Sequence, residues 1–460
     1  MSETRKVIKL LREHESRNVL FTEPDGSWPI VWDRAKGVHV WDAEGKEYLD
    51  LTAAFGVAAA GHANPRVVRA GQMQMTKLLH AMGDVHPHAL KAQLAHELSR
   101  LTFERWNQKS GKVIFSNSGF EAVESALKTA LLATGKRGVI AFEGAYHGLG
   151  YGALNTTHRE HFRSPFRPQL REFAHFVPFP IASRDSRLEK PHPKKLKIQR
   201  PKPKYSELHY DGCHEVEQSI RQLFHSKEIG AILVEPLQAR GGINIPPLEF
   251  LPRLRKLCDE FGALLILDEI YTGFGRTGKW FACEHSGVIP DLICLGKALT
   301  GGFPLSACVG CADLMDTAWP ASTGEAIHTS TFLGHPVGCA MALAQISEIR
   351  RLKLCERSTK LGTFLLRELD TLVTRRLSLV TSTRGLGLMA GVELNLPNGK
   401  PATVVALTAV KNLLQGGYIF LPEGEHANII GFTPPLTISE GQLAQAVAEL
   451  NQVLAAEQSR

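Results

Sequence analysis

Between about residues 65 and 325, short apolar runs alternate with longer segments of helical periodicity. Near-continuous apolar strands that are separated by helices are typical of a mostly parallel sheet with helices on both faces. Ligands of such sheets bind beyond the carboxyl ends of the strands. We therefore predict an α/β fold with its functional groups at those ends. The predicted strands are residues 113–115, 138–142, 231–234, 263–267 and 292–295.

Different patterns occupy the two ends of the chain. Residues 28–52 carry short runs of alternating polarity separated by turn residues, which predicts a small antiparallel meander. Beyond about residue 340, leucines and isoleucines recur at helical spacing, and residues 439–442 form a capping-box pattern that opens a final helix. We predict three parts: residues 1–64, an N-terminal segment and meander that packs with the small domain; residues 65–335, a large domain; and residues 336–460, a small α+β domain.

The composition of the 460 residues narrows the class of protein. A hydrophobic fraction of 43% can bury enough surface to offset chain entropy, so a disordered chain is excluded. No uninterrupted apolar stretch approaches the about 18 residues that a membrane span needs, and the amino end has no apolar signal-peptide core. We therefore expect a cytoplasmic protein with no membrane partner.

The eight cysteines are too sparse for a disulfide scaffold in a chain of this length. Cys308 and Cys311 form one C-x-x-C pair, but no second pair of cysteines or histidines stands at zinc-binding spacing. We predict reduced, packed thiols and no metal site.

The formal net charge of +7 is concentrated in one segment. Residues 183–204 hold nine basic and two acidic residues, so they carry the whole net charge and leave the rest of the chain neutral. Four prolines and no aromatic residue accompany these charges, which is typical of an exposed, extended loop. We predict a solvated insertion in the large domain. Binding of nucleic acid or of an acidic substrate is the less favoured alternative.

Polar residues or glycine turns follow each predicted strand. Ser118, Gly119 and Phe120 open a helix after the first strand, where free backbone N–H groups suit a phosphate. Tyr146 follows the second strand in a glycine-rich turn, where it can stack on a flat ring or cover the core. Glu235 follows the third strand, and a carboxylate directly after an apolar run is costly unless it has a partner.

Asp268 and Lys297 stand at the ends of the fourth and fifth predicted strands. Desolvation of a lysine at such a place disfavours its ammonium form and makes the amine a better nucleophile toward aldehydes. Lys297 alone would be interpreted as a lysine that extends to solvent. Together with the glycine turn, the tyrosine and the strand-end aspartate, it indicates a site for an aromatic phosphate that carries an aldehyde.

The segment ILDEIYTGFGRTGKWFACEHSGVIPDLICLGKALTGGFPL resembles the signature of the class III pyridoxal-phosphate aminotransferases. Further motifs of that family occur in its order. SNSGFEAVESAL, FEGAYHG and VEPLQARGG precede this segment, and HTSTFLGHPVGCA, RGLGLMAGVEL and FTPPLTI follow it. The resemblance extends over residues 28–456 apart from the basic insertion. It implies the fold type I architecture, with a large, mostly parallel seven-stranded sheet domain and a smaller α+β domain.

The resemblance also implies a cofactor and its contacts. Pyridoxal 5'-phosphate would form a Schiff base with Lys297, which then moves the substrate proton, and Asp268 would keep the pyridine nitrogen protonated. Thr331 would reach the phosphate from the neighbouring subunit, which implies a homodimer with shared active sites. The other expected cofactor contacts are Ser118, Gly119 and Phe120 at the phosphate, Tyr146 and Ile270 on the two ring faces, Tyr271 near the phenolic oxygen, and Glu235 and His147 behind them, although a structural role for His147 stays open.

The sequence departs from the family at positions that concern the substrate. Leu149 and Gly431 replace the two arginines that commonly bind the carboxylates of glutamate or 4-aminobutyrate. Arg240 stands where these relatives carry a glutamate that pairs with the second arginine. We hypothesise that Arg240 binds the substrate carboxylate from the opposite wall; the alternative is a surface arginine without a role in the site.

These features predict an aminotransferase that works in two half-reactions. It would pass an amino group from an amine or amino acid to a 2-oxo acid or aldehyde, with a donor that the usual glutamate arginines do not hold. The alternative within the same fold is an amino acid racemase or epimerase, or an aminomutase. A non-catalytic binding protein with a structural cofactor is a third class, disfavoured by the presence of both Lys297 and Asp268.

Overall fold

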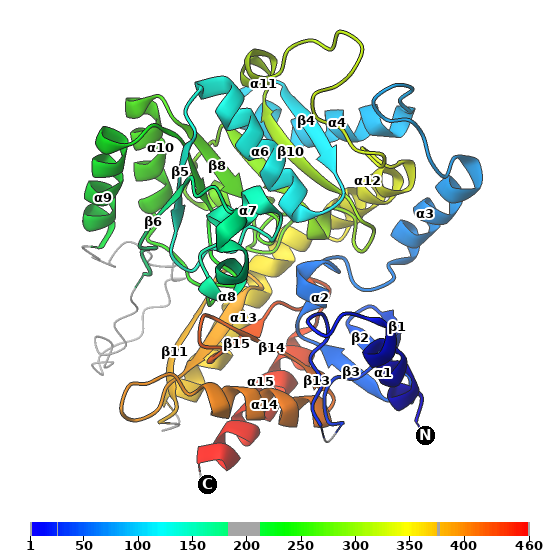
Figure 1. The fold of residues 1–460 in the computed structure, drawn as a ribbon. Coiled ribbons are helices and arrows are strands. Elements are labelled where there is room, and N and C mark those ends of the chain that lie inside the picture. Colours follow the sequence, from blue (N-terminus) through cyan, green and yellow to red (C-terminus); the bar gives the residue numbers. More distant parts are fainter. Residues whose placement is uncertain (1, 25, 183–211, 375–377, 459–460) are drawn as a thin grey trace, which may run out of the picture.

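The computed structural model describes residues 2–24, 26–182, 212–374 and 378–458 (Figure 1). The predicted basic insertion at 183–204 lies outside the described residues. A seven-stranded sheet forms the centre of the upper part in the order β4-β10-β9-β8-β7-β5-β6. Its strands are β4 (Gly111–Ser116), β5 (Gly138–Phe142), β6 (Ala174–Val177), β7 (Ile229–Val234), β8 (Leu264–Asp268), β9 (Leu292–Leu295) and β10 (Ser306–Cys311).

All neighbouring strands of this sheet run parallel except β10, which is antiparallel to both β4 and β9. The prediction of a mostly parallel sheet is therefore confirmed, and its five predicted strands are β4, β5, β7, β8 and β9. The sequence patterns missed β6, which has only four residues, and β10, whose serine, glycine and cysteines do not form an apolar run. Cys308 is buried in β10.

Helices cover both faces of the central sheet (Figure 1). α6 (Gly119–Thr134) packs against β9 and β10, and α4 (Ala89–Leu101) and α10 (Phe250–Phe261) lie against β4 and β8. α10 shows why these segments are helical, because its Leu251, Leu254, Leu257 and Cys258 recur at helical spacing and are all buried. The remaining helices of this part are α3 (Pro65–Lys77), α5 (Phe103–Asn107), α7 (Tyr151–Thr156), α8 (Glu160–Arg163), α9 (Gly212–Ser226) and α11 (Ala312–Ala318).

The predicted meander is present as β1 (Trp32–Lys36), β2 (His39–Asp42) and β3 (Glu47–Asp50), which pair antiparallel. β13 (Tyr418–Ile419), from the carboxyl-terminal region, adds to β3 in parallel. The amino- and carboxyl-terminal regions therefore share one sheet in the lower part of Figure 1. Two helices flank the meander, α1 (Glu3–His14) and α2 (Ala53–Gly56). The division into three domains stays a prediction.

A further four-stranded sheet has the order β11-β12-β15-β14, with β11 (Val380–Gly385), β12 (Ala390–Leu394), β15 (Ile429–Phe432) and β14 (Leu421–Glu423). The helices of this region are α13 (Leu354–Thr374), α14 (Thr403–Gln415) and α15 (Glu440–Gln458), whereas α12 (Pro336–Arg351) packs against α3 and α4 in the upper part of Figure 1. The predicted capping box opens α15, because Gln442 N donates to Ser439 Oγ at 3.2 Å and Ser439 N donates to Gln442 Oε1 at 3.0 Å.

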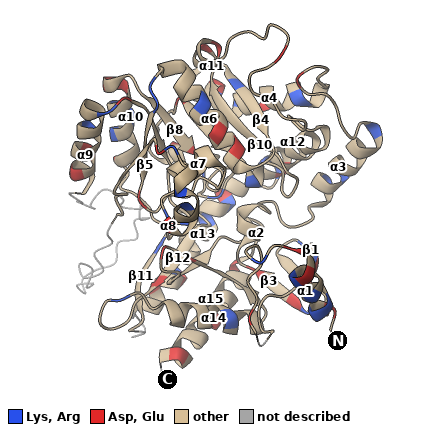
Figure 2. Cartoon of the chain, in the orientation of Figure 1, with Lys and Arg blue, Asp and Glu red and all other residues tan. Residues whose placement is uncertain are grey.

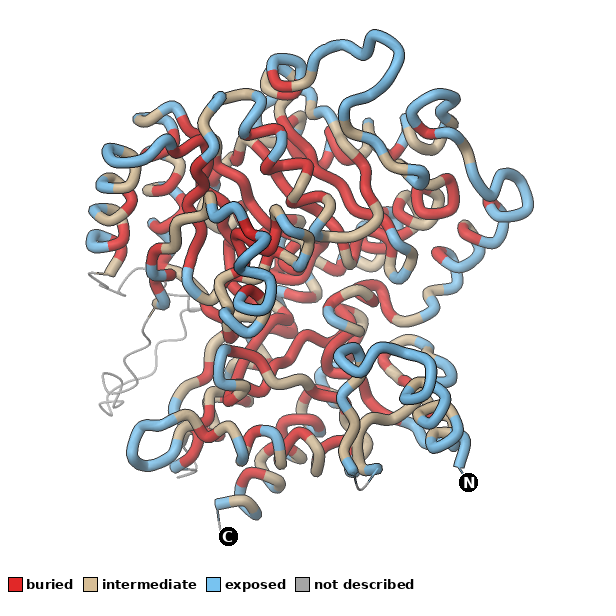
Figure 3. The backbone as a smooth tube through the Cα atoms, viewed as in Figure 1, coloured by how far each residue is buried: buried red, intermediate tan, exposed pale blue. Residues whose placement is uncertain are grey.

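Burial follows these sheets. In Figure 3 the strands of the central sheet and the connections below it are buried, whereas α1, α3 and the outer loops are largely exposed. Figure 2 shows the charged residues on outer helices such as α1 and α9, with few on the central strands. Charged residues at the strand ends are therefore exceptions to the pattern, and they mark the candidate site.

Candidate active site

Lys297 lies two residues after the buried strand β9. Gly296 leads into a short 3-10 helix, Lys297–Leu299, and Lys297 itself has a φ of 40°. Its Nζ atom lies 4.0 Å from the centre of the Tyr271 ring. Burial lowers the pKa of Lys297, although the negative charges of Asp268 and Glu235 oppose this effect. The site therefore holds a buried amine that loses its proton more readily than an exposed lysine does.

Asp268 is the last residue of β8 and pairs in register with Cys294 of β9. Its Oδ2 atom lies 2.8 Å from His147 Nδ1, and its Oδ1 atom accepts a hydrogen bond from Ile270 N at 3.1 Å. His147 is buried, and its Nε2 atom has no hydrogen-bond partner among the described residues. His147 is thus the partner that a buried aspartate at this strand end requires.

Glu235 joins the turns that follow two strands. Its Oε1 atom accepts a hydrogen bond from Tyr146 N at 3.1 Å, and its Oε2 atom accepts one from Ala239 N at 3.3 Å. Burial raises the pKa of Glu235 to about 7, with a further contribution from the negative charge of Asp268. Glu235 therefore fixes the backbone that carries Tyr146.

The turn before α6 has the geometry of an anion site. Ser118 is the N-cap, and Glu121 Oε2 accepts from Ser118 N at 2.7 Å in a capping box. The N–H groups of the next residues have no partner within a helix, because the first turn of any helix lacks them. Ser306 Oγ also donates to Ser118 O at 2.6 Å, which fixes the turn to β10.

Two glycines bring the backbone close to Ile270. A Cβ atom at Gly119 would stand 3.1 Å from Ile270 Cδ1, and one at Gly296 would stand 3.3 Å from Ile270 Cγ2. The helix start, Ile270 and the strand that ends at Lys297 thus lie together. A helix terminus for a phosphate, a buried amine and a buried carboxylate in one site fit a flat aromatic phosphate that carries an aldehyde.

Three predicted residues have positions that the sequence did not indicate. The ring of Tyr271 faces Lys297, while its hydroxyl lies 3.1 Å from Thr433 Oγ1. The Tyr146 ring lies edge-on to Phe162, with centroids 5.5 Å apart. Thr331 is exposed and makes no hydrogen bond to these site residues within the described chain.

Arg240 forms an ion pair that the sequence analysis missed. Its Nη1 atom donates to Glu423 Oε2 at 2.9 Å, and its side chain is 28% exposed. Glu423 lies on β14 beside Gly431, where a Cβ atom would stand 3.1 Å from Glu423 Cγ. Arg240 is therefore half-buried and paired rather than a solvated surface arginine. The clue in the sequence is the presence of two acidic residues, Glu423 and Glu425, shortly before Gly431.

Comparison with known proteins decides the family. The family model for class III aminotransferases matches residues 21–454. The chain belongs to the class III aminotransferase family. The resemblance stated from the motifs is thereby confirmed, and this aminotransferase is a pyridoxal-phosphate-dependent transaminase rather than a racemase.

Relatives at 37–38% identity carry aminotransferase names. Acetylornithine aminotransferase from Methanosarcina acetivorans is 38% identical over 389 residues, which cover 84% of this chain and 84% of the relative. The enzyme of the same name from Methanopyrus kandleri is 38% identical over 429 residues, 93% of this chain and 95% of the relative. Putrescine aminotransferase from Pectobacterium atrosepticum is 37% identical over 374 residues, 80% of this chain and 71% of the relative.

Solved structures show the same fold. A transaminase from the marine bacterium Virgibacillus superposes with a TM-score of 0.85 at 27% identity, over 99% of both chains. Ornithine aminotransferase from Toxoplasma gondii superposes with a TM-score of 0.81 at 26% identity, over 100% of this chain and 97% of the other. The predicted fold type I architecture is confirmed. None of the described helices of the aminotransferase is both long and apolar enough to span a membrane.

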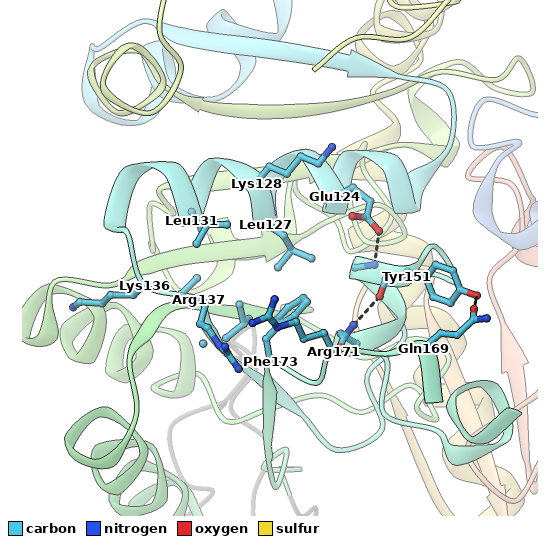
Figure 4. A pocket seen from close by; sticks show the side chains of 16 residues that line it. Glu124, Leu127, Lys128, Leu131, Lys136, Arg137, Tyr151, Gln169, Arg171 and Phe173 are labelled. Carbon is cyan, nitrogen blue, oxygen red and sulfur yellow. Dashed lines mark hydrogen bonds between the residues drawn. The ribbon is translucent and has the colours of Figure 1, made fainter. Parts of the chain in front are cut away.

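A second concave region lies apart from this site. This cavity has a volume of about 520 Å³. Figure 4 shows the side chains that line it from α6, α7 and neighbouring segments, among them Leu127, Phe173 and several charged residues. Glu124 on its rim accepts hydrogen bonds from Gly152 N at 2.8 Å and Ala153 N at 3.0 Å. None of the predicted cofactor or substrate residues lines this cavity.

Proposed function

We propose that Lys297 and Asp268 carry the chemistry of this transaminase, and that its amine donor is bound without the usual glutamate arginines. The second part rests on the ion pair of Arg240 with Glu423, in which position 240 supplies the cation rather than the family's glutamate. It rests also on Gly431, which has no side chain where the family carries an arginine. The first part is supported by the buried amine of Lys297 and by the contact of Asp268 with His147.

Residues that the fold brings together would hold the cofactor. Ser118, Gly119 and Phe120 at the start of α6 would receive the phosphate. Asp268 would hold a proton at the pyridine nitrogen, and Tyr146 and Ile270 would lie on the two faces of the ring. When bound, pyridoxal 5'-phosphate supplies an electron sink that stabilises negative charge developing at the substrate carbon.

The chain's own groups would then move one proton. The neutral form of Lys297, which burial favours, is the base that takes the proton from the substrate carbon and then donates it to a different atom. His147 would orient Asp268 through the 2.8 Å contact, and Glu235 would hold Tyr146 in place through its backbone. These two residues act through others and are positioning residues.

We also propose a cytoplasmic homodimer in which Thr331 of one chain reaches the phosphate site of the other. Apolar side chains are exposed on α3, on the connection that follows it and near Thr331, and a partner subunit would cover them. These side chains are Met73, Met75, Leu78, Leu79, Met82, Val85, Ile327 and Phe332. Sedimentation of a monomer at micromolar concentration would contradict the dimer.

The names of the relatives suggest the donor class. Acetylornithine and putrescine aminotransferases are named for substrates with an amino group at the end of a linear chain. A terminal primary amine of this kind needs no carboxylate clamp at Leu149 or Gly431. We therefore propose such an amine, or an amino acid that carries one, as the donor.

A donor screen tests the function. The purified, cofactor-loaded protein is mixed with one amine at a time, and the cofactor absorbance is followed without any acceptor. A transaminase converts the cofactor to its pyridoxamine form on donor alone, whereas a racemase only exchanges the α-proton with solvent. Conversion by glutamate alone, unaffected by Arg240→Ala, would contradict the proposed mode of donor binding.

A further inference from the structure

We infer that Arg159 and Arg240 together form a carboxylate-binding site for the 2-oxo acid acceptor and its amino acid product. The inference rests on the proposed function, since it names the substrate class of the same site. The sequence analysis proposed Arg240 alone as the residue that binds the carboxylate. Arg159 lies in none of the family motifs, and only the fold brings it near the site.

One short segment contacts both arginines. Arg240 Nη1 donates to Glu423 Oε2 at 2.9 Å, and Gly424 N donates to Arg240 O at 3.1 Å. The next residue, Glu425, accepts a hydrogen bond at its backbone oxygen from Arg159 Nη2 at 3.4 Å. Glu423, the last residue of β14, thus binds one guanidinium group, and Glu425, two residues later, binds the other.

Arg159 is also joined to the segment that carries Tyr146. His158 N donates to Ala145 O at 2.9 Å, next to Tyr146 in the chain. The Arg159 guanidinium lies 5.5 Å from the centre of the Phe162 ring, and that ring lies edge-on to Tyr146. Arg159 therefore stands beside the residue proposed to cover one face of the cofactor.

The two guanidinium groups have unused capacity for an anion. No carboxylate of the described residues lies within ion-pair distance of Arg159, and its one side-chain hydrogen bond is the long contact to Glu425 O. Burial and the positive charge of Arg240 lower the pKa of Arg159, and the negative charges of Glu425 and Glu423 oppose this effect only in part. Each guanidinium has five N–H donors in a fork that matches a carboxylate. A planar anion bound between the two guanidinium groups would relieve the repulsion between their positive charges.

The charges around the site also favour binding of a carboxylate at Arg159 and Arg240 rather than at the family's usual positions. Glu423 is buried and engages Arg240, while the carboxylate of Glu425 is on an exposed residue. Leu149 and Gly431 offer no cation. Arg276, whose charge acts on Tyr271, is buried and donates to the backbone oxygens of Leu388 and Pro434, and the proposed role of Lys297 requires its neutral form. A carboxylate is therefore drawn to Arg159 and Arg240.

The test compares substrates that differ only by a carboxylate. Arg159→Gln and Arg240→Gln are loaded with the pyridoxamine form of the cofactor and mixed with pyruvate, 2-oxoglutarate or acetaldehyde. We expect KM for the preferred oxo acid to rise at least about tenfold in each variant, because a charge-assisted hydrogen bond contributes at least that factor. The rate with acetaldehyde should stay unchanged. Arg171→Gln is the control, since Arg171 is exposed at the separate cavity of Figure 4.

Three further readouts keep the test decisive. Arg159→Lys keeps the positive charge without the forked donors, so it should bind the oxo acid more tightly than Arg159→Gln does. It also replaces Arg159→Gln in the test should that variant fail to fold. Calorimetric titration of unreactive propanoate should show binding to the parent protein that both glutamine variants lose. Unchanged KM in Arg159→Gln, or no preference of the parent protein for oxo acids over acetaldehyde, overturns the inference. A parent protein that converts no amine at all contradicts the proposed function instead.

Discussion

The two sides of the active site are built in different ways. The side that would hold the cofactor consists of residues at the carboxyl ends of strands of one sheet, such as Asp268, the last residue of β8, and Lys297, two residues after β9. The side that would hold the substrate is made by contacts between distant parts of the chain, such as Arg240 with Glu423. The first side follows the family pattern, whereas the second departs from it. The proposed chemistry and the proposed substrate specificity thus have separate structural supports.

Replacement of Lys297 by alanine should have the largest effect, because it removes the only base proposed for the proton transfer. We expect turnover to fall by at least about 10²–10⁴-fold, the usual contribution of a positioned base, together with loss of the lysine-linked absorbance. Absorbance and single-turnover kinetics measure both. Lys112→Ala, at an exposed lysine, should change neither. Retained turnover in the Lys297 variant would remove the basis of the cofactor side.

Asp268→Asn should have the next largest effect. The amide cannot hold a proton at the pyridine nitrogen, so the cofactor should stay bound while proton abstraction slows by roughly 10²–10³-fold, as for loss of one preorganised electrostatic group. Its contact with His147 gives a second variant, since His147→Phe should produce a smaller loss with unchanged KM. Equal rates in parent and Asp268→Asn would reject the proposed role.

The contrast between the two sides explains what the sequence could predict. Asp268 and Lys297 were found because each ends an apolar run, and local pattern is enough to place a strand end. Arg240 and Glu423 are 183 positions apart, and Arg159 and Glu425 are 266 apart. Such contacts depend on the pairing of β14 with β15 and on the path of loops, which no periodicity encodes.

The fold shows the same limit. The five strands with apolar runs were predicted, but β10 was missed because its small residues are buried only through pairing with β4 and β9. Cys308 of the C-x-x-C pair was predicted to be a packed thiol, and it is buried in an interior strand, although the strand itself was not predicted. Where tertiary pairing rather than residue type determines burial, the sequence pattern is silent.

Glu423 makes the substrate side sensitive to pH. Burial raises the pKa of Glu423 from 4.5 to about 7, so between these values the folded chain holds a proton that the unfolded chain has lost. Stability therefore falls as pH rises across this range, by at most about 1.4 kcal/mol per pH unit for this group. The melting temperature should decrease from pH 5 to pH 7, and this decrease should be smaller in Glu423→Gln than in the parent protein. Glu425→Gln, at an exposed residue, should keep the parent's slope.

The smallest expected effect concerns the fit of the cofactor side itself. A Cβ atom at Gly119 would stand 3.1 Å from two carbon atoms of Ile270, so Gly119→Ala should displace Ile270 from the proposed ring face. Such overpacking costs about 1–3 kcal/mol, and its low end, about 1 kcal/mol, corresponds to a cofactor affinity weakened roughly fivefold. Gly441→Ala is the matched control, because a Cβ atom there meets nothing within 4 Å. A lower melting temperature with unchanged cofactor affinity would show that Ile270 packs the turn without touching the ring, and the cofactor side would then rest on Tyr146 alone for its stacking.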